Sequence, residues 1–162
     1  MYRRALVPLD GSLVAESIVR LILQIAGPLD MEVVLLGVVV PVRPTVIDAG
    51  PVLVDDTDSL VAEVHAYLTP IADRLRASGV RVTTVVRRGD AVTEILAGAR
   101  EAQADVIIMT THGRTGFGRL FFGSVAEGVL RRADVPVFMM RQTPMQLAAQ
   151  LAEEGRATRA TG

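Results

Sequence analysis

A glycine-rich connection between a predicted strand and a predicted helix constrains this chain more than any other feature. It runs from Met109 to Ser124, reads M-T-T-H-G-R-T-G-F-G-R-L-F-F-G-S, and follows an apolar segment at 105–109. Glycine permits positive φ and lets a ligand approach the backbone closely. A helix that begins after such a connection offers unpaired N–H groups and the positive end of its macrodipole. The stretch therefore predicts a phosphate-binding loop.

Two common phosphate-binding motifs do not fit this stretch. The segment 118–125 has the glycine spacing of a P-loop, but Ser124 stands where that motif requires lysine. The chain contains no lysine at all, which excludes P-loop nucleotide hydrolysis and Schiff-base chemistry. The dinucleotide-binding fingerprint fails as well, because Phe121 stands where its third glycine belongs.

Length and composition exclude several other classes of protein. The 162 residues suit one domain, and a net charge of −1 gives no electrostatic reason to expect a nucleic-acid partner. No apolar run approaches the roughly 18 residues of a membrane span. Because there are no cysteines, disulfides and thiol chemistry are excluded. The first predicted strand begins within a few residues of Met1 without a signal sequence, so we expect a cytoplasmic protein.

Hydrophobic periodicity predicts five strands that alternate with four helices. We expect strands at 4–9, 31–40, 80–86, 105–109 and 135–140, with a long surface loop at 41–58. Helices are expected at 12–26, at 60–75 with a kink at Pro70, at 90–103 after an Asp90 cap, and from Ser124, which we expect to cap its helix with Glu127. This alternation predicts a single doubly wound, five-stranded parallel sheet, an α/β fold in three layers.

The glycine-rich stretch resembles the nucleotide-binding signature G-x2-G-x9-G-[S/T] of the universal stress protein family. Gly113 is followed by nine residues and then by Gly123-Ser124, whereas Thr110 occupies the first glycine position. The segments V-P-L-D-G-S at 7–12 and R-R-G-D-A-V-T-E-I at 87–95 extend the resemblance. We expect a universal stress protein domain over 1–141 and a tail over 142–162 that forms a short helix and then a disordered end.

The resemblance implies strand order 3-2-1-4-5 and a Rossmann-like sandwich similar to the adenine nucleotide alpha hydrolases. In such sheets ligands bind at the carboxyl ends of the strands where the order reverses, here between the first and fourth strands. Asp10 ends the first strand and the glycine-rich stretch follows the fourth. Two features about a hundred residues apart in the sequence are therefore expected to meet in one crevice.

The family resemblance also implies the ligand, an adenine nucleotide and in particular ATP, with Mg²⁺ or Mn²⁺ as a possible companion that Asp10 would help to hold. It implies that Asp10 contacts the ribose or helps to hold the metal, and that Pro8 and Leu9 line the base. It also implies that the backbone of Val38 meets the edge of the adenine. The implied nucleotide-binding residues are Pro8, Leu9, Asp10, Val38, Met109, Thr110, Gly113, Arg114, Gly123, Ser124 and Val125. No residue is assigned as catalytic, because His112 has no acid or nucleophile beside it in the sequence.

Three functions stay open at this point. A nucleotide-binding stress sensor or adaptor fits the motif, a slow ATP hydrolase or phosphotransferase would share the same pocket, and a ligand-free dimeric member would explain Thr110. We also expect a homodimer through the strand at 135–140, which is apolar on both faces and lies at a sheet edge in the order 3-2-1-4-5. The family resemblance implies the same arrangement.

Overall fold

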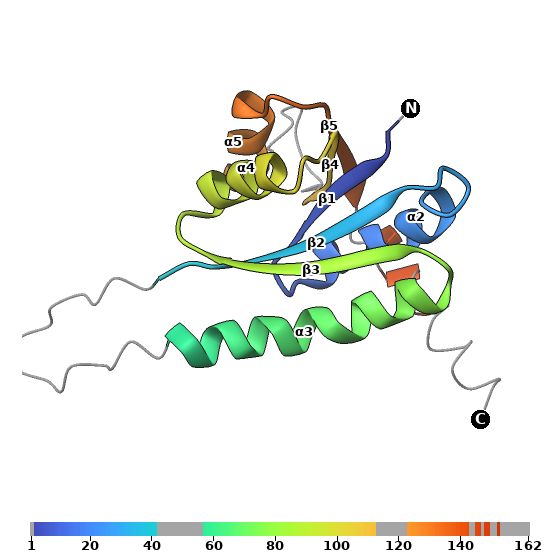
Figure 1. The fold of residues 1–162 in the computed structure, drawn as a ribbon, viewed down its shortest axis with the longest axis horizontal. Coiled ribbons are helices and arrows are strands. Elements are labelled where there is room, and N and C mark those ends of the chain that lie inside the picture. Colours follow the sequence, from blue (N-terminus) through green and yellow to red (C-terminus); the bar gives the residue numbers. More distant parts are fainter. Residues whose placement is uncertain are drawn as a thin grey trace, which may run out of the picture.

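Five parallel strands form one sheet in the order β3-β2-β1-β4-β5 (Figure 1). The computed structural model describes residues 2–41, 57–112 and 123–142, together with 145–146, 148–149 and 152 of the tail. The strands are β1 (Arg4–Leu9), β2 (Glu32–Val39), β3 (Arg81–Arg88), β4 (Val106–His112) and β5 (Val137–Gln142). The expected fold class and strand order are confirmed.

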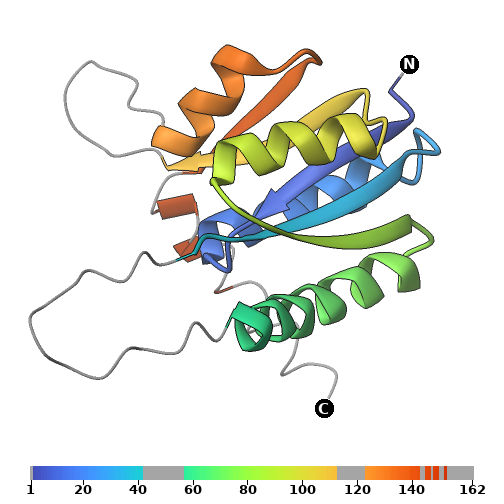
Figure 2. The same ribbon diagram turned by 60° about the vertical axis from the view of Figure 1, so that its left-hand side comes forward.

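Helices cover both faces of the sheet, which gives three layers (Figures 1 and 2). One face carries α1 (Leu13–Glu16), α2 (Ile18–Ile25) and α3 (Thr57–Ala77), and the other carries α4 (Ala91–Glu101) and α5 (Ser124–Arg132). Because successive strand residues point to opposite faces, the apolar run of β2 serves both cores. Leu35 packs with the α1–α3 layer and Leu36 with the α4–α5 layer, and both are fully buried.

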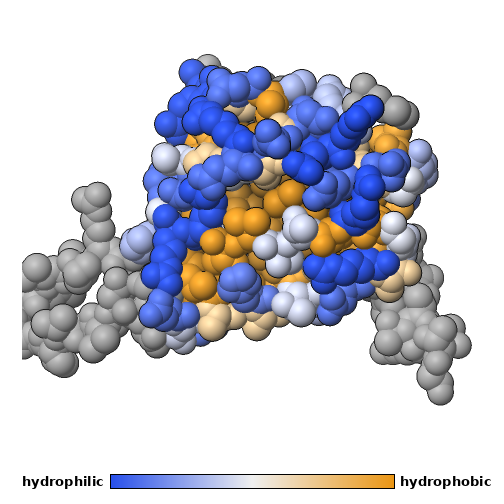
Figure 3. All heavy atoms as spheres, viewed as in Figure 1, coloured by the Kyte–Doolittle hydropathy of each residue, from blue (hydrophilic) through white to orange (hydrophobic). Residues whose placement is uncertain are grey.

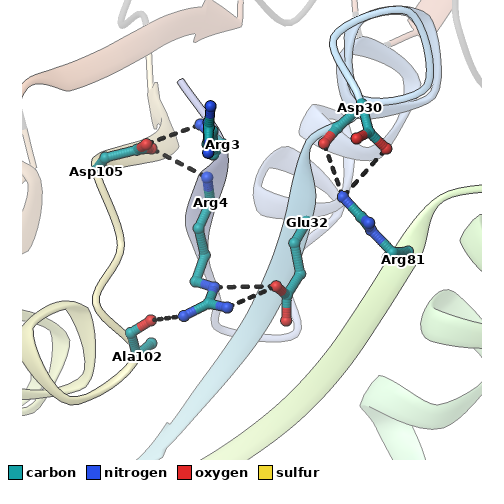
Figure 4. A network of polar contacts seen from close by, with 7 residues as sticks. All are labelled: Arg3, Arg4, Asp30, Glu32, Arg81, Ala102 and Asp105. Atoms are coloured by element: carbon teal, nitrogen blue, oxygen red, sulfur yellow. Dashed lines mark hydrogen bonds and ion pairs between the residues drawn. The ribbon is translucent and has the colours of Figure 1, made fainter. Parts of the chain in front are cut away.

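A network of charged side chains joins the amino ends of the strands (Figure 4). The Asp105 carboxylate accepts hydrogen bonds from the N–H groups of Arg3 and Arg4 at 2.7 and 3.1 Å. The Arg4 guanidinium donates to Glu32 on β2 and to the carbonyl of Ala102 beyond α4. These contacts tie β1 to both neighbouring segments at the end of the sheet opposite the predicted ligand crevice.

The helix expected over 12–26 is divided in two, so that expectation is wrong at Ser17. The Ser17 hydroxyl donates to the carbonyl of Val14 at 2.6 Å, and its N–H bonds to both Leu13 and Val14. Serine side chains that bond to nearby carbonyls compete with the regular helical ladder and interrupt it. The interruption ends α1 after one turn, and α2 begins at Ile18, with both helices packed on the same face of the sheet.

The start of β5 and the end of β4 also differ from the sequence expectation. Strand β5 begins at Val137 because Pro136 has no N–H to give the ladder and contributes its carbonyl to the N–H of Ile107 instead. Strand β4 extends to His112 because its last residues pair with Met140, Arg141 and Gln142 of β5. Residues 110–112 therefore belong to the strand, and only the residues after them can form the glycine-rich connection.

The two edge strands of the sheet are β3 and β5. Strand β3 lies between α3 and α4, and the surface there is largely hydrophobic with charged side chains around it (Figures 1 and 3). Strand β5 exposes half of the Phe138 side chain. The described residues of the predicted tail helix, Met145, Gln146, Ala148, Ala149 and Ala152, are helical, and the expected disordered end falls outside the described part of the chain. Among the described helices, none combines the length and apolar character that crossing a membrane requires.

Candidate functional site

A cavity of about 370 Å³ opens at the carboxyl ends of β1, β2 and β4. Its size lies within the range of roughly 300–1,000 Å³ that is usual for small-ligand sites. Nine of the predicted nucleotide-binding residues line it, namely Pro8, Leu9, Asp10, Val38, Met109, Thr110, Gly123, Ser124 and Val125. Gly113 and Arg114, the other two, lie outside the described residues. Segments that are far apart in the sequence thus meet around one hollow.

Strand pairing explains why the sheet opens at this place. The pairing of β1 with β2 ends at Leu9 and Gly37, and that of β1 with β4 covers only Ala5 and Leu6. Strands β2 and β4 continue past these points to Val39 and His112. The backbone of β2 from Val38 onward consequently faces the crevice without a neighbouring strand on that side. A ligand can take the hydrogen bonds that a strand would otherwise make.

The turn after β1 presents the Asp10 carboxylate at the cavity wall. Gly11 has φ of +80°, a conformation that favours glycine, and the chain reverses there into α1. One Asp10 oxygen accepts the N–H of Ser12 at 3.0 Å, and the Ser12 hydroxyl oxygen accepts the N–H of Ala15 as the α1 cap. Asp10 itself stays exposed. Because one oxygen holds the turn, the other is available to accept from a ligand hydroxyl or to meet a cation.

The amino terminus of α5 forms the opposite wall, and its cap differs from the expectation. Gly123 is the N-cap, with φ of −58° and ψ of 150°, and Ser124 is the first helical residue, so the expected Ser124 cap and its capping box with Glu127 are wrong. A glycine cap supplies no side-chain acceptor, and the first helical bond runs from Glu127 N–H to Gly123 C=O. The preceding N–H groups of the first turn are therefore left for another acceptor.

The floor of the cavity is apolar and includes residues that sequence reasoning missed. Ala91 and Ile95 come from the first turns of α4, and Leu36 and Val40 continue the alternation of Val38 along β2. That period-two pattern was the available signal for Leu36 and Val40. Ser12, Ala15, Thr111 and Ala126 are the other described residues of the lining. For Ala91 and Ile95 no local signal existed, because the packing of α4 against the sheet decides what they face.

Asp10 is the only charged side chain among the described residues that line the cavity. Close by, burial raises the pKa of the Tyr67 hydroxyl well above its usual value, and the negative charges of Glu16 and Asp10 raise it further. At the start of α4, hydrogen bonds from the hydroxyl and N–H of Thr93 hold the pKa of the Asp90 carboxyl below its usual value. Tyr67 thus stays neutral beside the β1–α1 turn, while Asp90 stays ionised as the α4 cap.

The sequence matches the model of the universal stress protein family over residues 1–141. This chain belongs to that family. It is 32% identical over 143 residues to universal stress protein MJ0531 of Methanocaldococcus jannaschii, a match that covers 88% of this chain and 84% of the relative. The family expected from the sequence is therefore confirmed.

Solved structures of universal stress proteins share the fold. One is a complex with cAMP, 21% identical, with a TM-score of 0.63 over 86% of this chain and 97% of that one. Another is an Arabidopsis thaliana protein with AMP bound, 17% identical, with a TM-score of 0.61 over 89% of this chain and 94% of that one. At these identities the likeness establishes the arrangement of strands and helices alone.

In this universal stress protein the two adjacent threonines of β4 face opposite sides of the sheet. By strand alternation, Thr111 lies on the α4–α5 face with Met109, whereas Thr110 lies on the α1–α3 face with Ile108. Thr110 stands at the first glycine position of the family signature and still contributes to the cavity lining. The Thr110 side chain, however, projects from the α1–α3 face of the sheet, whereas most residues of the cavity floor lie on the α4–α5 face.

Proposed function

We propose that this universal stress protein binds an adenine nucleotide, ATP in particular, in the cavity at the carboxyl ends of β1, β2 and β4, and acts as a stress sensor or adaptor. The observation that carries the proposal is the convergence of nine predicted site residues, from four separate segments, on one cavity. Family membership adds support, as do the relatives whose solved structures hold cAMP and AMP.

Each part of the proposed ligand meets suitable chemistry. The adenine ring would lie on the apolar floor near Val38, whose backbone can hydrogen-bond to the base edge, and Asp10 would accept from the ribose hydroxyls. Phosphate groups would take the free N–H groups of the α5 first turn and the Ser124 hydroxyl, which makes no hydrogen bond within the described part of the chain. A Mg²⁺ or Mn²⁺ ion that accompanies the phosphates would find the Asp10 carboxylate, and one carboxylate besides phosphate oxygens suits Mg²⁺.

Calorimetric titration with adenosine, AMP, ADP, ATP and GTP tests this proposal. We expect binding of adenine nucleotides and weaker or no binding of GTP, because the backbone of one strand end fixes the edge of the base. The absence of tryptophan also makes co-purified adenine easy to detect in the ultraviolet spectrum of a denatured extract. A protein that carries no adenine and shows no binding in titration would instead be the ligand-free, dimeric kind of family member.

Binding without turnover is expected for the same pocket. Asp10 is the sole ionisable side chain among the described lining residues, and it already accepts the Ser12 N–H, so the described walls supply no evident proton relay for hydrolysis. Steady-state release of phosphate from ATP, measured with Mg²⁺ and with Mn²⁺, separates a sensor from a slow hydrolase or phosphotransferase. Sustained multiple turnovers by purified protein would favour the enzyme.

Replacing Thr110 with glycine should tighten nucleotide binding by about 1 kcal/mol or less. The gain is small because the Thr110 side chain starts from the face of β4 that carries α1, so its removal relieves only a marginal contact with the ligand. A titration of both proteins with AMP measures the difference. Weaker binding by Thr110→Gly would show that the threonine hydroxyl itself holds the nucleotide.

We further propose a homodimer in which β5 pairs with its own copy across a two-fold axis. Strand β5 ends the sheet, and no strand among the described residues pairs with its outer edge. The Phe138 side chain is 50% exposed there, whereas Val137 and Met139 pack against the α4–α5 core. An isologous antiparallel contact would satisfy both edges and cover both phenylalanines.

Light scattering at micromolar concentration should give about twice the 17.3 kDa chain mass, and Phe138→Lys should halve it. Lysine at this exposed position adds charge to the proposed contact without entering the core. Leu60→Lys is the matched control, because Leu60 is a similarly exposed apolar residue on α3, and it should leave the mass unchanged. A monomeric wild-type protein under these conditions would contradict the dimer.

A further inference from the structure

Strand β3 leaves one side of its backbone open along the edge of the sheet (Figure 1). All eight of its residues are in register with β2, and no strand among the described residues pairs with its other side. An unpaired edge presents a row of N–H and C=O groups that another polypeptide can take as hydrogen-bond partners. The open side of β3 is therefore a possible place of strand addition, and its chemistry indicates what it would accept.

Two hydrogen bonds show which residues of β3 turn their backbone outward. The N–H of Gly89, directly after the strand, donates to a carbonyl of β2. The carbonyl of Val82 instead accepts from the Arg76 guanidinium of α3, at 3.0 Å from Nη2. Because successive residues of a strand alternate in direction, Thr84 and Val86 face outward like Val82. No hydrogen bond within the described part of the chain occupies the outward groups of Thr84 or Val86.

The surface beside these free backbone groups is apolar. Val86 packs with the α1–α3 layer and Val85 with the α4–α5 layer, and both side chains are only half-buried. Figure 3 shows the hydrophobic surface that β3 forms between the two layers. Side chains of an added strand would alternate between these layers and bury more of both valines. An extended polypeptide matches the free hydrogen-bonding groups and the apolar surface together.

The charge of β3 indicates the ends of such a polypeptide. The strand carries Arg81, Arg87 and Arg88 and no acidic residue. At its two ends Arg81 pairs with Asp30 and Arg88 with Asp58, whose side chains are 89% and 92% exposed. Exposed ion pairs contribute little free energy, so a carboxylate of an incoming chain can replace either acid. Pairing β3 with its own copy would bring the arginines of both copies together, which is unfavourable.

We propose that the open edge of β3 binds an extended segment of a partner protein, apolar in its centre and acidic at its ends, which adds to the sheet as a sixth strand. Thr84, Val85 and Val86 do not line the nucleotide cavity. The docking edge is therefore independent of the proposed nucleotide site, and the protein can hold both ligands at once. Such an edge gives a stress adaptor a physical means of contacting its partner.

A fluorescein-labelled octapeptide of alternating valine and threonine, with an aspartate at each end, serves as the probe in a fluorescence anisotropy titration. The wild-type protein should bind it saturably, and added salt should weaken binding because the arginines are exposed. A probe with lysine at both ends should bind about tenfold more weakly or worse. Of two aspartate probes N-methylated at alternate residues, only the one whose methyl groups face away from β3 should bind.

Thr84→Pro tests the same edge from the side of the protein. Proline removes the outward N–H and places its ring where the added strand would lie, and edge strands tolerate proline where the N–H faces away from the sheet. The affinity for the aspartate probe should fall about tenfold or more. Thr84→Val is the matched control, because it keeps the N–H, and it should bind like the wild type. The N-methylated probes keep the test decisive if the proline variant does not fold.

Three results would overturn the proposal without affecting the nucleotide site. A wild-type protein that binds neither the aspartate nor the lysine probe has no docking edge of this kind. Binding that ignores N-methylation, or wild-type affinity in a folded Thr84→Pro protein, would refute strand addition. If light scattering finds Phe138→Lys still dimeric, and adding Thr84→Pro makes it monomeric, the edge pairs with a second copy and not with a partner protein.

Discussion

Replacing Gly123 with valine should lower the affinity for adenine nucleotides about a hundredfold or more while the protein stays folded. The φ of −58° at this N-cap is open to any residue, and a Cβ atom built there meets nothing within 4 Å. The added side chain would project into open space at the cavity wall, where the phosphates are proposed to lie. Loss of two hydrogen bonds to charged phosphate oxygens corresponds to about 3 kcal/mol, which is roughly a hundredfold.

The cost to folding of Gly123→Val should be about 1 kcal/mol, because valine is a poorer N-cap than glycine. Gly27→Val is the matched control: a Cβ at Gly27 also meets nothing within 4 Å, and Gly27 does not line the cavity. Titration with AMP and chemical denaturation of the three proteins measure both quantities. If folded Gly123→Val binds AMP like the wild type, the turn into α5 is not part of the site.

Gly37→Ala should destabilise the fold by about 1–3 kcal/mol, the usual range for overpacking a filled core. Gly37 lies on β2 beneath α3, and a Cβ there would overlap the Cγ1 atom of Val64 and approach Leu68 Cδ1 to 3.4 Å. Leu68 is fully buried, so neither helix nor strand can yield without breaking other contacts. Glycine is required at this position by close approach and not by its φ, because its φ is not among the positive values.

Truncating the opposing side chain should rescue much of that loss. In the double variant Gly37→Ala with Val64→Ala, the new methyl group occupies space that the valine has vacated, so the two changes should not add. Urea denaturation of the wild type, both single variants and the double variant gives the coupling free energy. Strictly additive losses would show that Val64 is not what excludes a side chain at Gly37.

Local pattern in the sequence was sufficient for the alternation of strands and helices, whereas the strand order was implied by the family resemblance. The alternation of apolar strands with amphipathic helices, the Asp90 cap and the Gly27-Pro28 helix stop are short-range signals, and each corresponds to an element boundary in the structure within a few residues. The family signature and Asp10 also placed the predicted site residues at two strand ends. Parallel topology then brings those ends together, because all carboxyl ends lie on one edge of the sheet.

Tertiary contacts decided what local pattern could not. The extension of β4 to His112 depends on pairing with residues 140–142, about 30 positions later, and no window around Thr111 contains that information. The same pairing places Thr111 on the cavity side and Thr110 on the other, and it shortens the connection to α5. Gly123 became the helix cap in place of Ser124, although Ser124-Val-Ala-Glu127 reads as a capping box.

The succession of strands and helices and the glycine motif were thus set by the sequence alone, since both depend on residues close together along the chain. Packing between distant segments decided the rest. It determined which buried hydroxyls lack a partner among the described residues, which alanine of α4 lines the cavity and which glycine has no room for a methyl group. Hydrogen-bond satisfaction and steric exclusion act within a few ångströms in space, whatever the separation in sequence.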